Sequence, residues 1–235
     1  MRITEKLVDL FFPPRCPICD EPIPSGEGCV CRKCRSGPVR IRGSMCLKCG
    51  KPLNDEAEYC ADCRQRKHFY KKGVSVFEYG SISDSLYRFK NSGRQEYARF
   101  YAEAIVSAHS DFLRSVAPDM LIPVPIHISK LRQRGYNQAY VLCREISRLT
   151  NIPVNDKLIV RQKKTAPLKD LGLSERQNNL NRAFKIGVDD VKLKTVIIVD
   201  DIYTTGSTID EMSRTILERF PCEIYFITLT VGTGI

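Results

Sequence analysis

Two adjacent carboxylates, Asp200 and Asp201, are followed within a few residues by a short stretch that is rich in hydroxyl groups. Carboxylates accept hydrogen bonds from a polyol and bind divalent cations. Closely spaced backbone N–H groups around a glycine at the start of a helix bind a phosphate. A ribose 5-phosphate satisfies both features, because it presents a polyol and a phosphate. The residues expected to hold the phosphate are Thr204, Thr205, Gly206, Ser207 and Thr208.

The neighbouring residues predict the elements that position these side chains. Residues 196–199 are four consecutive β-branched residues, typical of a strand that is buried on both faces of a parallel sheet. Open α/β sheets bind ligands at the carboxyl ends of such strands. Ile209, Met212 and Ile216 follow a helical spacing, so a helix should begin at the loop. The competing interpretation is a solvated Asp-Asp turn with a Thr-rich helix cap, which does not explain why two acids precede the loop.

Residues 196–208 closely resemble the phosphoribosyl-diphosphate (PRPP) motif of the type I phosphoribosyltransferases. The resemblance implies that Asp200 and Asp201 contact the ribose hydroxyls, with or without a bound magnesium ion, and that the loop holds the 5-phosphate. Some members place an acid four residues after the first carboxylate, as a base for the incoming nucleophile. Here that position is Thr204, and no catalytic residue is assigned. Any transfer would need a nucleophile that requires little deprotonation.

Eight of the eleven cysteines form four C-x-x-C pairs in the N-terminal part of the chain. Each pair can direct two thiolates at one ion, and two pairs complete a tetrahedral zinc site without an open position. The sequence therefore predicts a double zinc ribbon with two structural zinc ions. The spacing favours pairing of neighbours and leaves an interleaved arrangement open. The predicted ligands are Cys16, Cys19, Cys31, Cys34, Cys46, Cys49, Cys60 and Cys63.

A disulfide framework is the alternative for these cysteines, but it needs an export signal and an oxidising compartment, and neither is indicated. Cys29 is left over, Cys143 and Cys222 are expected to be packed thiols, and His68 is expected not to bind metal. No membrane span is predicted. Residues 3–11 predict an amphipathic helix docked on the protein, because the polar face lacks the cations of a membrane-surface helix.

The organisation changes near residue 73, from closely spaced cysteines to alternating strands and helices. We predict an N-terminal helix and double zinc ribbon over residues 1–72. Residues 73–235 should form an α/β domain like that of type I phosphoribosyltransferases, with a parallel sheet flanked by helices. The formal charge is +10, but metal-bound thiolates would cancel part of it, so charge alone does not indicate nucleic-acid binding. Strands are predicted at 74–79, 120–122, 157–160, 196–199 and 223–230, and helices at 82–90, 95–113 and 136–149.

Two basic segments follow predicted strands and are candidates for binding a diphosphate or DNA phosphates. The first, 130–135, contains Arg132 and Arg134 and lies where a phosphoribosyltransferase sheet has its diphosphate loop. The second contains Lys163 and Lys164 and has no sustained apolar period, which predicts a basic loop. Guanidinium groups bind both kinds of phosphate bidentately. The alternative is a solvated face.

Nearly the whole chain is similar to the ComF family. The resemblance implies a cytoplasmic protein of natural competence that receives or processes incoming single-stranded DNA, with PRPP and other competence proteins as further partners. It also implies an amidophosphoribosyltransferase-like domain, which is either a binding module or an active transferase acting on PRPP and an unknown acceptor. The roles of Arg176 and Asn179 do not follow from it. The matching features are the C-x-x-C pairs, Lys90 with Gly93, residues 123–125, residues 132–138, Leu173-Ser174 with Arg176 and Asn179, and the PRPP motif.

The predicted DNA-binding surface lies where the basic segments converge beside the phosphate loop. Arg132 and Arg134 should emerge at the carboxyl end of one strand, and residues 161–164 at that of another. Tyr136 and Tyr203 are the nearest candidates for base stacking. Cations that could extend the surface from the ribbons are Arg32, Lys33 and Arg35.

Overall fold

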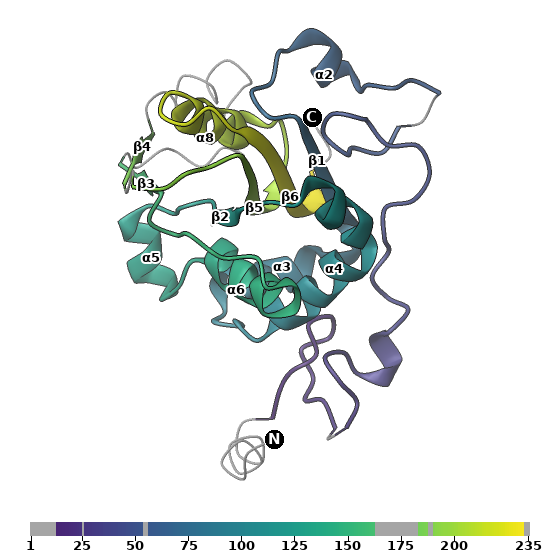
Figure 1. The fold of residues 1–235 in the computed structure, drawn as a ribbon. Coiled ribbons are helices and arrows are strands. Elements are labelled where there is room, and N and C mark those ends of the chain that lie inside the picture. The colour runs from purple at the N-terminus through teal and green to yellow at the C-terminus, as the bar shows by residue number, and fades with distance from the viewer. Residues whose placement is uncertain (1–12, 25, 54–55, 163–182, 188–189, 233–235) are drawn as a thin grey trace.

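The structure is a computed structural model, and it describes residues 13–24, 26–53, 56–162, 183–187 and 190–232 (Figure 1). The predicted helix at residues 3–11 lies outside the described residues, as do Lys163, Lys164, Arg176 and Asn179. Within the described ranges, no helix is both long and apolar enough to cross a membrane.

A four-stranded parallel sheet forms the centre of the protein, in the order β1-β6-β5-β2. Its strands are β1 (Lys72–Glu78), β2 (Met120–Pro123), β5 (Thr195–Tyr203) and β6 (Glu223–Val231). β5 pairs with β6 as far as Tyr203, but with β2 only as far as Val199. The last four residues of β5 therefore extend beyond β2 at the carboxyl end of the sheet, where the acid pair lies.

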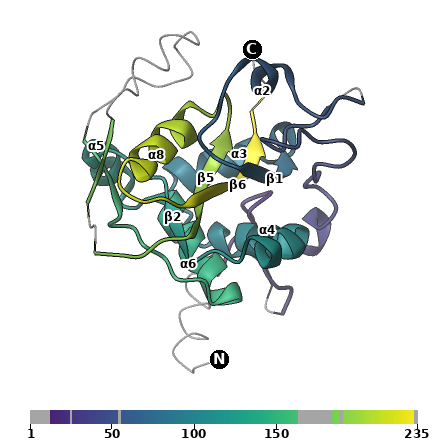
Figure 2. The ribbon, with the colours of Figure 1, turned by 45° about the horizontal axis from the view of Figure 1, so that its top comes forward.

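Helices cover both faces of this sheet, and successive residues of β5 belong to opposite cores. α3 (Tyr79–Asn91), α4 (Tyr97–Val116) and α6 (Gln138–Thr150) lie on one face, and α8 (Ser207–Leu217) lies on the other (Figures 1 and 2). Ile197 and Val199 pack in the core with α4 and α6. Val196 and Ile198 pack in the core with α8. Because both faces are buried, the strand is continuously apolar, and the predicted fold class is confirmed.

Two predicted segments differ from the structure. The strand expected at 157–160 is β3 (Ile159–Arg161), which pairs antiparallel with β4 (Phe184–Ile186) in a separate two-stranded sheet. The prediction that residues 161–164 follow a strand of the main sheet was therefore wrong. A short apolar run does not specify which strand it pairs with. The segment 130–135, expected to turn, lies mostly in the helix α5 (Ile128–Arg134), which ends at Gly135 with φ +80°.

The two cysteine-rich ribbons pack differently against the α/β domain. The first contains the 3₁₀ helix η1 (Arg32–Cys34), and the second contains α2 (Ala61–Gln65). Cys16, Ile23 and Cys31 of the first ribbon form a small separate cluster. Cys46 and Cys49 of the second are buried in the same core as α8. The second ribbon is thus packed into the α/β core, and the boundary at residues 72 and 73 stays a prediction.

Candidate functional site

The acid pair lies within β5, not after it as the sequence suggested. Alternation along the strand turns the two side chains to opposite sides. Asp200 Oδ1 accepts a hydrogen bond from the backbone N–H of Asp201 at 2.8 Å. The buried Asp201 carboxylate forms an ion pair with Lys90 Nζ at 2.9 Å and accepts a hydrogen bond from Gln138 Nε2 at 3.1 Å. The end of α3 and the start of α6 therefore converge on Asp201.

Lys90 contacts this pair, and three further cations are grouped near it; we call the four the cation cluster: Lys90, Lys130, Arg134 and Arg161. Burial lowers the pKa of Lys130, and the charges of Arg134, Arg161 and Lys90 lower it further, so these groups lie close together. Burial also lowers the pKa of Arg161, whereas the negative charge of Asp200 acts in the opposite direction and raises it. The structure therefore brings Arg161 near Asp200, and Arg134 near Lys130. Arg132 is exposed on α5, and Lys163 and Lys164 lie outside the described residues.

Two cations of the cluster were not assigned to the site from the sequence. Lys90 was noticed only through the family resemblance, and Lys130 only as part of a basic segment. Neither has a local pattern that places it near Asp201, because both lie far from it in the sequence, Lys90 by more than a hundred positions. The one sequence signal that could have pointed to Lys90 was its position at the end of a predicted helix, just before Gly93.

The predicted phosphate loop joins β5 to α8. Gly206 precedes the first residue of α8 and has φ +81°, a conformation that glycine adopts without strain. The Thr205 and Ser207 hydroxyl oxygens lie 2.9 Å apart. The first N–H groups of a helix have no partner within the helix, so those of α8 are available to an anion. Loop and acid pair thus occupy the same end of β5.

The second ribbon and its linker hold this loop in place. Tyr70 and Tyr203 share a hydrogen bond between their hydroxyls at 2.7 Å. In the first turn of α8, the Asp210 carboxylate lies 2.7 Å from His68 Nδ1 and accepts the backbone N–H of Phe69 at 3.1 Å. Through Asp210, His68 supports the helix that carries the loop.

Neither tyrosine that the sequence suggested for base stacking is available. Tyr203 is 2% exposed and Tyr136 is 7% exposed. The Tyr136 hydroxyl donates to the Phe89 carbonyl oxygen. Their rings pack in the two cores, so the stacking prediction was wrong.

Two groups of four cysteines each bring their sulfur atoms together within 4.8 Å. One comprises Cys16, Cys19, Cys31 and Cys34, and the other Cys46, Cys49, Cys60 and Cys63. Neighbouring pairs therefore combine, and the interleaved arrangement is excluded. The hydrogen bond between Cys63 and Cys49 lowers the pKa of Cys49 to about 5 and raises the pKa of Cys63, because the two thiols share a proton that zinc would displace. Four thiolates fit structural zinc, which would hold each ribbon together without an open position for chemistry.

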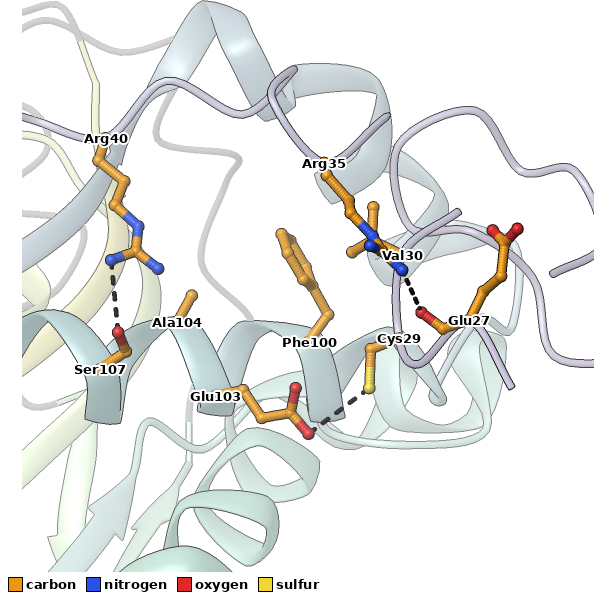
Figure 3. Close-up of a pocket in the computed structure, with 9 residues that line it drawn as sticks. All are labelled: Glu27, Cys29, Val30, Arg35, Arg40, Phe100, Glu103, Ala104 and Ser107. Carbon is orange, nitrogen blue, oxygen red and sulfur yellow. Dashed lines mark hydrogen bonds between the residues drawn. The ribbon is translucent and has the colours of Figure 1, made fainter. Parts of the chain in front are cut away.

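The three remaining cysteines lie outside both groups of four. Cys143 is fully buried, and burial raises its pKa well above its usual value. Cys222 packs at the edge of the core with α8. Cys29 Sγ donates to Glu103 Oε1 at 3.5 Å, at the edge of a cavity of about 360 Å³ between the first ribbon and α4 (Figure 3). Arg35 and Arg40 also line this cavity, whose lining includes neither the acid pair nor the cation cluster.

The acid pair should make stability depend on pH. Burial and the adjacent charge of Asp201 raise the pKa of Asp200 to about 7. Between about pH 4 and pH 7 the folded protein then holds a proton that the unfolded chain has released. Stability should therefore fall as pH rises through this window. We expect Asp200→Asn to lose less stability than the parent protein between pH 5 and pH 7.5, as measured by urea unfolding.

The control for this experiment is Asp84→Asn, because Asp84 is an exposed carboxylate on α3. It should keep the pH dependence of the parent protein. If Asp200→Asn also keeps it, Asp200 is not the group that holds the proton.

Comparisons with known proteins match the two parts of the chain separately. Residues 7–64 match the double zinc ribbon domain, and residues 134–232 match the phosphoribosyl transferase domain. The chain is 30% identical to competence protein F of Haemophilus influenzae, over 87% of this chain and 91% of the relative. It is 28% identical to the DNA utilization protein YhgH of Escherichia coli, over 89% and 93%. It is 30% identical to competence protein ComFC of Bacillus subtilis, over 81% and 78%.

Proposed function

The chain belongs to the family of competence protein F and ComFC, and from this premise we propose that it supports natural transformation by handling incoming single-stranded DNA in the cytoplasm. We further propose that its α/β domain binds PRPP at the carboxyl end of β5. The relatives' names support the role in competence and DNA utilization. The geometry of the site supports PRPP as the ligand.

The observation that carries the PRPP proposal is the convergence of three kinds of group at one end of β5. The acid pair can accept hydrogen bonds from ribose hydroxyls. The loop at the start of α8 can hold the 5-phosphate. The cation cluster can neutralise the diphosphate, since Arg134 and Arg161 offer bidentate donors. In addition, the buried Gln138 Oε1 has no hydrogen-bond partner among the described residues, so it is available to a ligand hydroxyl.

Magnesium fits the same site. Carboxylate oxygens and substrate phosphates are the ligands that magnesium prefers, and it is usually held by one or two carboxylates. Asp200 and Asp201 would hold the ion, which would neutralise part of the diphosphate charge. Lys90 would then share Asp201 with the ion or turn to the diphosphate. Magnesium should therefore strengthen PRPP binding.

Calorimetric titration of the intact protein with PRPP, ribose 5-phosphate and inorganic diphosphate, each with and without magnesium, tests the proposal. PRPP should bind most tightly because it alone reaches the acid pair, the loop and the cation cluster. Ribose 5-phosphate lacks the diphosphate, and diphosphate lacks the ribose. Equal affinity for PRPP and diphosphate would mean that the site is only an anion site.

Transferase activity is the second candidate function, and the cation cluster favours it. Positive groups placed where a diphosphate would depart stabilise the charge that develops on it. Thr204 occupies the position of the acid that some relatives use as a base, so ammonia is a suitable test nucleophile. Enzyme-dependent release of diphosphate from PRPP with ammonium would support transfer. Binding without release would leave the domain as a binding module.

A further inference from the structure

The linker that follows the second ribbon is unusually basic. Residues 64–72 contain Arg64, Arg66, Lys67, Lys71 and Lys72, together with Phe69, and no carboxylate. We call this segment the ribbon strip. All of its residues are described, and most of its cations are exposed. It was not part of the DNA surface that the sequence predicted.

Burial alternates along the centre of the ribbon strip. His68 is 8% exposed and Tyr70 is 1% exposed, whereas Phe69 between them is 48% exposed. Lys67 and Lys71 are exposed as well. The strip therefore presents an aromatic ring to solvent with a cation before it and another after it.

The backbone that carries this ring is held at several points. The Phe69 N–H donates to Asp210 Oδ1 at 3.1 Å, and the Lys71 N–H donates to the Ile224 carbonyl oxygen at 2.7 Å. The Tyr70 ring packs edge-on against Phe226 with centroids 4.8 Å apart. Phe69 is thus exposed on an ordered backbone, and little entropy would be lost when a flat ligand stacks on its ring.

Nearby carboxylates neutralise little of this positive charge. Asp210 is engaged by His68 and Phe69, and Asp62 forms an ion pair with Lys51 at 2.6 Å. Lys71 lies 3.3 Å from Glu223, but both side chains are more than half exposed. Surface pairs of this kind contribute little and are screened by salt. A polyanion could therefore replace Glu223 at low cost.

We propose that the ribbon strip binds single-stranded DNA, with the cations on phosphates and Phe69 stacked on a base. Cations combined with an exposed aromatic ring are the recurring means of binding single strands without sequence preference. Asp210 connects the ribbon strip to the first turn of α8, so the bound DNA would lie beside the phosphate loop. The choice of DNA as partner rests on the proposed function, whereas the surface and its stacking residue come from the contacts above.

The test compares two ligands of equal length, a fluorescent oligothymidylate and an oligonucleotide of abasic sites, by anisotropy. Loss of one stacked base typically costs about 1–3 kcal/mol, so Phe69→Ala should weaken oligothymidylate binding about fivefold or more. The abasic strand has no base to stack and should bind Phe69→Ala as it binds the parent protein. The double variant Arg64→Ala with Lys67→Ala should bind both oligonucleotides more weakly, and the salt dependence of its affinity should be smaller.

Tyr87→Ala is the matched control, because Tyr87 is an aromatic residue on α3 that is 65% exposed. It should leave both affinities unchanged, and urea unfolding should show that every variant keeps its fold. If the parent protein binds DNA and Phe69→Ala binds it equally well, the ribbon strip is not the surface, while the proposed function stands. If the parent protein binds neither strand, both proposals fall. Competition by polyglutamate at the same affinity would identify an acidic protein partner instead and overturn the inference.

Discussion

Loss of zinc from the second Cys₄ site should abolish PRPP binding, whereas loss of zinc from the first should leave it nearly unchanged. The reason is the different packing of the two ribbons. Cys46 and Cys49 share a core with α8, and the first ribbon forms a cluster of its own. Structural zinc supplies apparent binding free energies of about 10–16 kcal/mol, which act as folding free energy. Without it, the second ribbon should not stay ordered.

Disorder of the second ribbon should also disorder the phosphate loop, because residues 64–72 connect the two. Tyr70 holds Tyr203 immediately before the loop, and His68 holds Asp210 immediately after it. Lys51 of the second ribbon also lies over the Tyr203 ring, 5.8 Å from its centroid. The N–H groups of the loop bind a phosphate well only if the loop holds them in a fixed arrangement.

The comparison uses Cys63→Ser for the second site and Cys34→Ser for the first. Each variant should retain one zinc ion per chain by elemental analysis. Calorimetry should detect PRPP binding by Cys34→Ser at close to the affinity of the parent protein, and none by Cys63→Ser. Equal affinities in the two variants would show that the second ribbon does not position the loop.

Gly206→Ala should destabilise the whole protein, not only the ligand site. A Cβ atom at this position would lie 2.6 Å from the Tyr203 hydroxyl oxygen, and the residue would be held at φ +81°. The Tyr203 ring stacks on Phe226 with centroids 4.8 Å apart, so it has little room to move. Backbone strain of this kind costs about 1–3 kcal/mol, and overpacking adds about 1–3 kcal/mol.

Gly43→Ala separates the two contributions. Gly43 also has φ +81°, but a Cβ atom there meets no other atom within 4 Å. It should show the backbone strain alone. Urea unfolding should therefore give a larger loss of stability for Gly206→Ala than for Gly43→Ala. Equal losses would mean that Tyr203 moves aside without cost, and that the loop is less tightly supported than these contacts indicate.

The features that could be predicted from the sequence are those encoded locally. The apolar run at 196–199 and the helical spacing that follows Gly206 each lie within a short window, and both elements formed as predicted. The C-x-x-C spacing likewise predicted two Cys₄ groups of neighbouring pairs.

The features that could not be predicted depend on partners far away in the chain. β3 pairs with β4 instead of joining the main sheet. Lys90 meets Asp201, and His68 meets Asp210, across more than a hundred residues. No periodicity in a single segment reports such contacts, so the cation cluster and the support of the loop by the second ribbon became visible only in the folded chain.

The central claim is that the acid pair and the phosphate loop bind one phosphoribosyl ligand. Its most direct test is the dissociation constant of PRPP, measured by calorimetry in magnesium, for the parent protein and for Asp200→Asn with Asp201→Asn. Replacing both carboxylates removes their charge-assisted hydrogen bonds at nearly constant volume, so the affinity should fall at least about tenfold, or about 1.4 kcal/mol. An unchanged dissociation constant in the folded double variant would contradict the claim.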